Sequence, residues 1–251
     1  MPVHWLKKNQ GIAIIQVDRP KVSNALDWEA MHTFAGYIDK AYQEPELKAL
    51  ILTGTGKTFI AGGDLKKLST YKRETDGRRL ARIMSSALNR LEGLPCLTLA
   101  AVNGLARGGG AEIALACDFR ILSENSDLGF VQISMGLSPG WGGGQRLLRL
   151  VGYSRALEWL IEGRILSADE AFAFGVANRL APTGRALSTA IEFARQLASQ
   201  PLGVVNAIKR ILRAGLIFPK ETAGAIEMET FVQLWTTEEH FQAVEKFINR
   251  S

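Results

Sequence analysis

The chain has 251 residues, 47% of them hydrophobic, so it can bury one large core or a core with an appendage. Its net charge of +5 comes from 30 basic and 25 acidic residues that are scattered along the sequence. No basic block or arginine-rich arm is present, which argues against nucleic acid as a partner. The mild positive excess fits a phosphate-bearing ligand and fits an ordinary solvated surface equally well. With no signal peptide, no apolar run of membrane length and two cysteines in apolar runs, we expect a soluble cytoplasmic protein that is not bound to a membrane.

The first part of the chain alternates strand patterns with turn residues. Residues 3–7 and 12–17 predict two strands joined by a turn. Asp27 is a good N-cap, and residues 28–42 after it predict an amphipathic helix. Residues 47–53 predict another strand, and this region leads into paired glycines before a helix start near residue 65.

The stretch 97–120 has the same local order. Residues 97–102 predict a buried strand, three glycines follow at 108–110, and helical spacing then resumes with Glu112 in the first turn. Such a junction aims backbone N–H groups and the positive end of the helix dipole at one point, and here a carboxylate lies beside it. A turn glycine and a dipole-favoured glutamate are the simpler explanation of one junction alone.

Two such junctions about 45 residues apart make the functional interpretation stronger. They can supply two N–H groups that converge on a single oxygen, because glycine leaves room for a substrate carbonyl to approach the backbone. The pattern predicts an oxyanion site with an acid/base beside it.

Other chemistries lack support in the sequence. His4, His32 and His240 are widely separated and none adjoins a glycine turn, which disfavours a Ser/His/Asp hydrolase. The sequence has no zinc spacing, no phosphate loop and no dinucleotide-binding glycine pattern, so no metal is expected. Asp64 and Asp118 are interpreted as a helix cap and a turn residue.

The remainder of the chain is mostly helical. Helical spacing covers residues 145–151, 155–162, 168–174, 187–198, 204–212, 222–235 and 238–248. Strand patterns end near residue 190, so we expect a core over residues 1–190 and a helical region over residues 191–251. Phe231 and Trp235, four residues apart, fit packing in a helix core; the family resemblance given below implies instead that they line a ligand tunnel.

Several segments together resemble the crotonase superfamily, the enoyl-CoA hydratase/isomerase family. They are Asn24-Ala25-Leu26-Asp27, residues 59–65, residues 103–118, Ser138-Pro139-Gly140-Trp141-Gly142-Gly143 and residues 167–180. The resemblance implies an α/β fold, a crotonase-like spiral of ββα units, with a C-terminal helical region that assembles a homotrimer or a dimer of trimers. It also implies an acyl-CoA substrate, with coenzyme A part of that substrate and no tightly bound cofactor.

The resemblance further implies functional residues. Gly63 and Gly109 would form the oxyanion hole, and Glu112 falls where the family has one of two catalytic glutamates. The coenzyme A thioester would contact Ala25, Leu26, Ala61, Gly63, Asp64, Leu65 and Trp235. The second glutamate position holds Gln132, which cannot exchange a proton at neutral pH.

Gln132 leaves the reaction open. Hydration or isomerisation of an enoyl-CoA is the family's usual chemistry. The local sequence of residues 111–120 and the Pro-Gly-Trp-Gly-Gly run, however, are more similar to the ethylmalonyl-CoA decarboxylase branch. A non-catalytic or RNA-binding member is the alternative from another class, although no basic and aromatic residues are interleaved as single-strand binding requires. We also expect Gly109→Val to abolish activity without unfolding the protein, because the new side chain would meet ligand rather than core.

Overall fold

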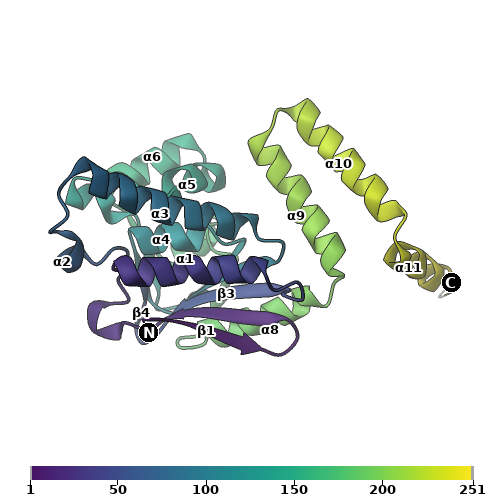
Figure 1. Ribbon diagram of the computed structural model, residues 1–251, viewed down its shortest axis with the longest axis horizontal. Coiled ribbons are helices and arrows are strands. Elements are labelled where there is room, and N and C mark those ends of the chain that lie inside the picture. The colour runs from purple at the N-terminus through teal and green to yellow at the C-terminus, as the bar shows by residue number, and fades with distance from the viewer. Residues whose placement is uncertain (1, 250–251) are drawn as a thin grey trace. The chain divides into compact units, whose positions relative to one another are not determined.

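The computed structural model describes residues 2–249 (Figure 1). The chain divides into two compact units, Met1–Arg195 and Gln196–Ser251. The boundary expected near residue 190 lies inside helix α8 (Ala186–Ala198), which continues a few residues past the division between the units.

The first unit is built on a six-stranded sheet in the order β1-β2-β3-β5-β7-β10. Only β1 and β2 pair antiparallel; the other neighbours are parallel. Every residue of β3 and β5 is buried, as parallel strands covered on both faces require. The strands are β1 (Val3–Lys8), β2 (Ile12–Val17), β3 (Ala49–Gly54), β5 (Leu97–Val102), β7 (Phe119–Ser123) and β10 (Arg179–Ala181).

A second sheet of four short strands, in the order β4-β6-β8-β9, is reached from the first sheet by short turns. Each of β3, β5 and β7 is followed within a few residues by β4, β6 or β8, and helices then return the chain to the first sheet. This repetition makes the spiral of ββα units that the resemblance implied. The short strands are β4 (Thr58–Ile60), β6 (Leu105–Arg107), β8 (Asp127–Gly129) and β9 (Ile165–Ser167).

Two long helices lie side by side over this core, α1 (Trp28–Tyr42) and α3 (Glu74–Gly93) (Figure 1). The predicted bounds of α1 and its Asp27 cap are confirmed, since the Asp27 carboxylate accepts a hydrogen bond from the Ala30 N–H. No element was predicted for residues 66–96, where α3 lies. Its buried residues Met84, Ala87, Leu88 and Leu91, with the partly buried Leu80 and Ile83, form an apolar stripe over residues 80–91 that the sequence analysis missed.

The remaining helices of the first unit surround the strand ends. They are the 3-10 turns η1 (Pro20–Val22) and η2 (Val131–Met135), and the helices α2 (Leu65–Leu68), α4 (Gly109–Leu115), α5 (Gly143–Val151), α6 (Tyr153–Glu162) and α7 (Ala168–Ala173). The helix pattern predicted from residue 145 onward is confirmed to within a few residues at each end.

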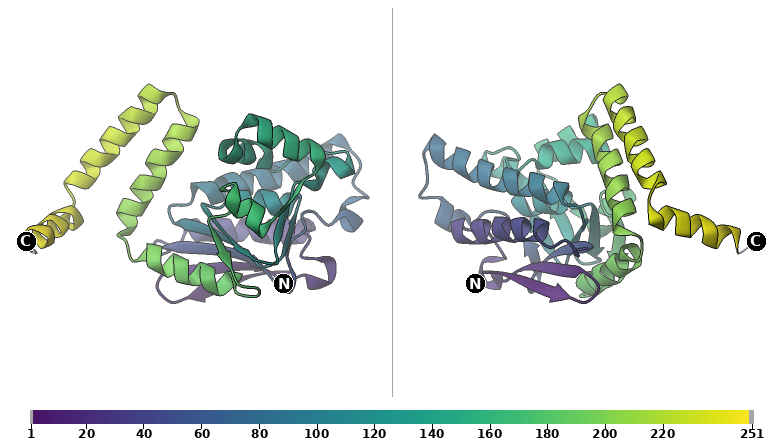
Figure 2. Two further views of the ribbon diagram at one scale, coloured as in Figure 1. Left: turned by 180° about the vertical axis from the view of Figure 1, so that it is seen from behind. Right: turned by 45° about the vertical axis from the view of Figure 1, so that its right-hand side comes forward.

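The second unit consists of α9 (Leu202–Ile217), α10 (Lys220–Trp235) and α11 (Glu238–Ile248), after the end of α8. Figure 2 shows α9 and α10 as an antiparallel pair. In the part of the chain that the structure describes, no helix combines the length and apolar character needed to cross a bilayer.

Candidate active site

The first glycine junction lies between β4 and α2 and pairs with the loop before α1. The Leu26 N–H donates to the Gly62 carbonyl at 2.7 Å, and the Asp64 N–H donates to the Leu26 carbonyl at 2.9 Å. These two bonds form a parallel bridge between Leu26 and Gly63. They use the Gly62 carbonyl and the Asp64 N–H, so the Gly63 backbone groups do not take part. The Gly63 N–H is therefore directed away from Leu26.

Charged side chains fasten the two loops of this first junction together. Arg19 donates to Asp27 at 2.7 Å and to Asp64 at 3.3 Å, and the Lys67 ammonium also reaches Asp27. Burial alone would raise the pKa of Asp27, but hydrogen bonds from Lys67 and the Ala30 N–H, with the charge of Arg19, lower it below the usual value. Asp64 caps α2, as predicted.

The residues expected to contact coenzyme A gather at the first junction, with one exception. Ala25 is buried beside Leu26, the Ala61 N–H donates to the Ser23 carbonyl at 3.2 Å, and Leu65 is 57% exposed at the start of α2. Trp235 belongs to the second unit, where its ring centroid lies 5.6 Å from that of Phe231. Both aromatic residues are more than half exposed, so core packing does not explain them within this chain.

The second junction runs from β6 through Gly108 into α4. Gly108 is the N-cap with φ +49°, a conformation that favours glycine, and the first N–H groups of α4 have no carbonyl one turn before them in the helix. A Cβ placed on Gly62 would lie 3.1 Å from the Gly109 nitrogen, so the two junctions adjoin. The structure thus brings the neighbourhoods of Gly63 and Gly109 together.

The expectation that Gly109→Val would leave the fold intact is wrong. A Cβ on Gly109 would overlap the indole ring of Trp141, which is 6% exposed, and a Cβ on Gly110 would overlap the Ile60 carbonyl. The extra side chain would meet core before it met ligand, because glycine here permits close packing of α4 against its neighbours. Sequence reasoning could not foresee this contact, since Trp141 approaches from 32 residues further along the chain.

Glu112 is 2% exposed and its carboxylate is held at both oxygens. Oε1 accepts the N–H groups of Trp141 and Gly143, each at 2.8 Å, and Oε2 accepts the Gln132 amide at 3.2 Å. Burial raises the pKa of Glu112, and the hydrogen bonds from Gly143, Trp141 and Gln132 offset part of that rise. A buried carboxylic acid with a raised pKa is suited to exchanging protons near neutral pH.

Gln132 lies between Glu112 and the second junction. A Cβ on Gly108 would be 4.0 Å from the Gln132 Cδ, which places the amide beside the N-cap of α4. Its Nε2 faces Glu112, whereas its Oε1 is buried and has no hydrogen-bond partner among residues 2–249. An unpaired buried acceptor costs about 1–3 kcal/mol, so a ligand or water that donates to it would be favoured.

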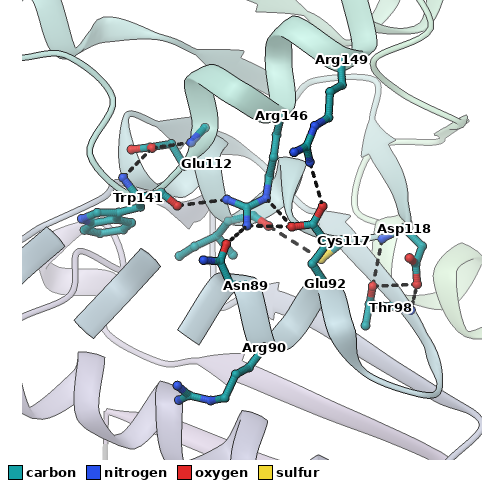
Figure 3. Close-up of polar contacts among 12 residues, drawn as sticks. Asn89, Arg90, Glu92, Thr98, Glu112, Cys117, Asp118, Trp141, Arg146 and Arg149 are labelled. Atoms are coloured by element: carbon teal, nitrogen blue, oxygen red, sulfur yellow. Dashed lines mark hydrogen bonds and ion pairs between the residues drawn. The ribbon is translucent and has the colours of Figure 1, made fainter. Parts of the chain in front are cut away.

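A third set of residues, missed by the sequence analysis, lies behind Glu112 (Figure 3). Arg146 of α5 donates to the Trp141 carbonyl at 3.0 Å, and it also reaches Asn89 and Glu92 of α3. The clue was present in the pair 89 and 92, three residues apart and therefore on one helix face, but α3 itself was not predicted.

The structure has the spiral of ββα units that the family resemblance implied, and it has a buried carboxylate at a helix start beside two glycine junctions. Comparisons with known proteins agree. The family model described as Enoyl-CoA hydratase/isomerase matches residues 7–251. The chain belongs to the enoyl-CoA hydratase/isomerase family and is an acyl-CoA-processing enzyme.

Similar proteins include members with two different names. A short-chain-enoyl-CoA hydratase of Clostridium acetobutylicum is 35% identical over 98% of this chain and 94% of its own length. An ethylmalonyl-CoA decarboxylase of Gallus gallus is 32% identical over 93% of this chain and 79% of its own length. The crystal structure of an enoyl-CoA hydratase from Bacillus anthracis is 30% identical, with a TM-score of 0.94 over 100% of this chain and 97% of that one.

Proposed function

We propose that the N–H groups of Gly63 and Gly109 form an oxyanion hole for the thioester carbonyl of an acyl-CoA. The adjoining glycine junctions support this, because a Cβ on Gly62 would lie only 3.1 Å from the Gly109 nitrogen and the bridge to Leu26 does not use the Gly63 N–H. A donor of this type contributes about 3–4 kcal/mol to transition-state stabilisation. The same junctions would hold the coenzyme A portion against Ala25, Leu26, Ala61, Asp64 and Leu65.

Glu112 is the group that we propose to exchange the proton. Its Oε1 accepts two backbone N–H groups, whereas Oε2 accepts only the Gln132 amide and keeps a lone pair for a substrate or water. Negative charge that develops on the carbon next to the thioester delocalises onto the carbonyl oxygen, and the oxyanion hole stabilises this enolate. The observation that carries the proposal is this fixed, buried carboxylate next to the α4 N-terminus.

Two reactions use this arrangement, and we propose hydration or isomerisation of an enoyl-CoA as the first. The hydratase relatives and the family model support it. Decarboxylation of an alkylmalonyl-CoA is the second candidate, favoured by Gln132. Loss of carbon dioxide leaves its electron pair on the substrate as the enolate, so that step needs the oxyanion hole but not a second carboxylate.

Separate incubations with crotonyl-CoA and with ethylmalonyl-CoA, followed by mass spectrometry, would decide between these reactions. A mass gain of one water from crotonyl-CoA supports hydration, and loss of carbon dioxide from ethylmalonyl-CoA supports decarboxylation. Turnover of neither thioester, by protein with a native circular dichroism spectrum, would count against both candidates.

Glu112→Gln tests the proton-transfer role directly. The substitution keeps the shape of the side chain and removes proton exchange, so turnover that requires it should fall by at least about 10²-fold. Glu124→Gln is the matched control, because Glu124 is exposed, and its turnover should equal that of the wild type. A Glu112→Gln enzyme with wild-type turnover would remove Glu112 from the mechanism.

We also propose that the second unit mediates assembly into a homotrimer or a dimer of trimers. Large apolar side chains on its helices are more than half exposed in the single chain, among them Leu212, Met228, Phe231, Trp235, Phe247 and Ile248. Such exposure is unusual for a monomer and favours burial against other subunits. Sedimentation velocity measurements would test the stoichiometry.

A cytoplasmic location is likewise proposed, supported by the buried positions of Cys96 and Cys117.

A further inference from the structure

The turn at residues 141–143 holds Glu112, and two of its carbonyl groups accept hydrogen bonds from one residue. The N–H groups of Trp141 and Gly143 donate to Glu112 Oε1. The Trp141 carbonyl accepts from the Arg146 guanidinium at 3.0 Å, and the Gly142 carbonyl accepts from the Arg146 backbone N–H at 3.3 Å. Arg146 therefore binds the turn through one side-chain and one main-chain hydrogen bond.

The guanidinium of Arg146 is itself fixed. Its side chain is 6% exposed, and it donates to Asn89 at 2.8 Å and to Glu92 at 2.9 Å, both from the last turns of α3 (Figure 3). Gly142 leaves space for it, since a Cβ there would lie 2.5 Å from the Arg146 Nη1. A planar fork with several donors can bind two anchors and a carbonyl at once, which an ammonium cannot do.

We infer that Arg146 is a positioning residue for Glu112: braced by Asn89 and Glu92, it sets the turn whose two N–H groups orient the reactive carboxylate. This inference rests on the proposed role of Glu112 in catalysis. It assigns to α3, which touches neither glycine junction by any bond described above, a part in the reaction that acts only through Arg146 and the turn.

Loss of Arg146 should change Glu112 in a direction that can be worked out. Without the guanidinium bond to the Trp141 carbonyl, the turn can change conformation and its two N–H groups can move away from Oε1. The carboxylate stays buried. Fewer hydrogen bonds to the charged form raise the pKa of Glu112 further. The charged side chains on elements packed against α4 are Arg146 and Arg149 of α5 and Arg107 of β6, the last paired with Asp127.

The experiment compares Arg146→Gln, Arg146→Lys and the control Arg149→Gln. Arg149 is on the same helix and bonds the same Glu92 at 3.4 Å, but its side chain is 38% exposed, and among the described residues its hydrogen bond goes to Glu92 rather than to the turn. The pKa of Glu112 is followed by carbon NMR of protein labelled at the glutamate carboxyl carbon, with the Glu112 signal assigned by its loss in Glu112→Gln. Turnover of crotonyl-CoA or ethylmalonyl-CoA, whichever is the substrate, is measured over the same pH range.

We expect Arg146→Gln to raise the pKa of Glu112 by about one unit and to lower kcat by about 10²-fold through misplacement of the carboxylate, with little change in KM. Arg146→Lys should move both values in the same direction by less, and it decides the question if Arg146→Gln does not fold. Arg149→Gln should match the wild type. In the Glu112→Gln background, Arg146→Gln should lower kcat no further, because the group it positions is already disabled.

An unchanged Glu112 titration in folded Arg146→Gln or Arg146→Lys would overturn the inference. Independent, multiplied losses in the double variant would do the same. Because the titration needs no turnover, it separates this inference from the proposed function: a fully active Glu112→Gln enzyme would refute the latter alone.

Discussion

The two glycine junctions have the same local order of strand, glycine and helix, yet they are held by different forces. At the first, Arg19, Asp27, Asp64 and Lys67 form an ion-pair cluster, and the following helix α2 has only four residues with none buried. At the second, α4 is buried from Gly110 to Leu115, and its glycines touch an indole ring and a backbone carbonyl.

The difference indicates how each junction responds to change. Packing at native density leaves no room for an added methyl group, so the second junction should lose stability when its glycines are replaced. An ion-pair cluster tolerates added atoms but depends on pH and salt. The two N–H groups that we propose for the oxyanion hole therefore belong to one rigid, tightly packed junction and one adjustable junction held by ion pairs.

Gly109→Ala should have the largest combined effect. Its Cβ would overlap the Trp141 ring, and overpacking of this kind costs about 1–3 kcal/mol in the free energy of unfolding. Because Trp141 also donates to Glu112, displacement of Trp141 should abolish turnover as well. Urea denaturation and steady-state turnover measure the two effects.

Gly77→Ala is the matched control for glycine replacement. Gly77 lies in α3 with nothing within 4 Å of an added Cβ, so the variant should gain about 0.5–1 kcal/mol and keep wild-type turnover. If Gly109→Ala proved as stable and as active as the wild type, the description of the second junction as rigid would be refuted.

Gly63→Ala should separate function from stability. Its Cβ would lie 2.9 Å from a terminal methyl group of Leu68, which can rotate away, so the free energy of unfolding should change little. The methyl group would also crowd the backbone beside the Gly63 N–H that we propose as an oxyanion donor, and loss of one such donor lowers kcat by about 10²–10³-fold. Wild-type kcat in this variant would remove Gly63 from the oxyanion hole.

Strong local signals made several helices and strands predictable from the sequence. The bounds of α1, of the strand β5 and of α11 follow from their cap or from an uninterrupted apolar run, each of which is complete within a few residues. Glu112 could be placed in the first turn of α4 because a glycine run and the return of helical spacing are both local.

What depends on distant contacts could not be predicted. The apolar stripe of α3 over residues 80–91 has local helical spacing and was overlooked, whereas its packing partner α1 could not be inferred from that spacing. The hydrogen bond from Arg146 to the Trp141 carbonyl joins residues that are close in the sequence. Its other partners, Asn89 and Glu92, are 57 and 54 residues away in the chain. Spacing in one sequence carries no record of such long-range pairs.

Gln132→Glu sharpens the comparison at the second junction by adding a second carboxylate beside Glu112. If water activation needs two proton-exchanging groups, the wild type should hydrate crotonyl-CoA slowly and the variant should be about tenfold faster. On the opposite view a like charge raises the pKa of one carboxyl and slows the enzyme. The hydration rate of both forms against pH distinguishes these outcomes, with Gln145→Glu at an exposed position of α5 as the control. A fast native hydratase slowed by Gln132→Glu would contradict our expectation.

Asp27→Asn tests the ion-pair support of the first junction and should have the smallest effect. Asparagine is as good an N-cap as aspartate, so the bond to the Ala30 N–H can persist while the charge seen by Arg19 and Lys67 is lost. Removing a charge-assisted hydrogen bond from a side chain that is 8% exposed should cost about 1–2 kcal/mol in the free energy of unfolding at pH 7.

The pH dependence of that loss follows from the sign of the shift. The pKa of Asp27 is lowered in the folded protein, so its contribution is complete above the unfolded value of about 3.9 and disappears as the pH falls through the folded pKa. Wild type and Asp27→Asn should therefore differ in urea denaturation at pH 7 and converge under strongly acidic conditions, whereas exposed Asp169→Asn should follow the wild type throughout. A difference that persisted unchanged at low pH would mean that packing, rather than charge, holds this junction, and the contrast between the two junctions would fail.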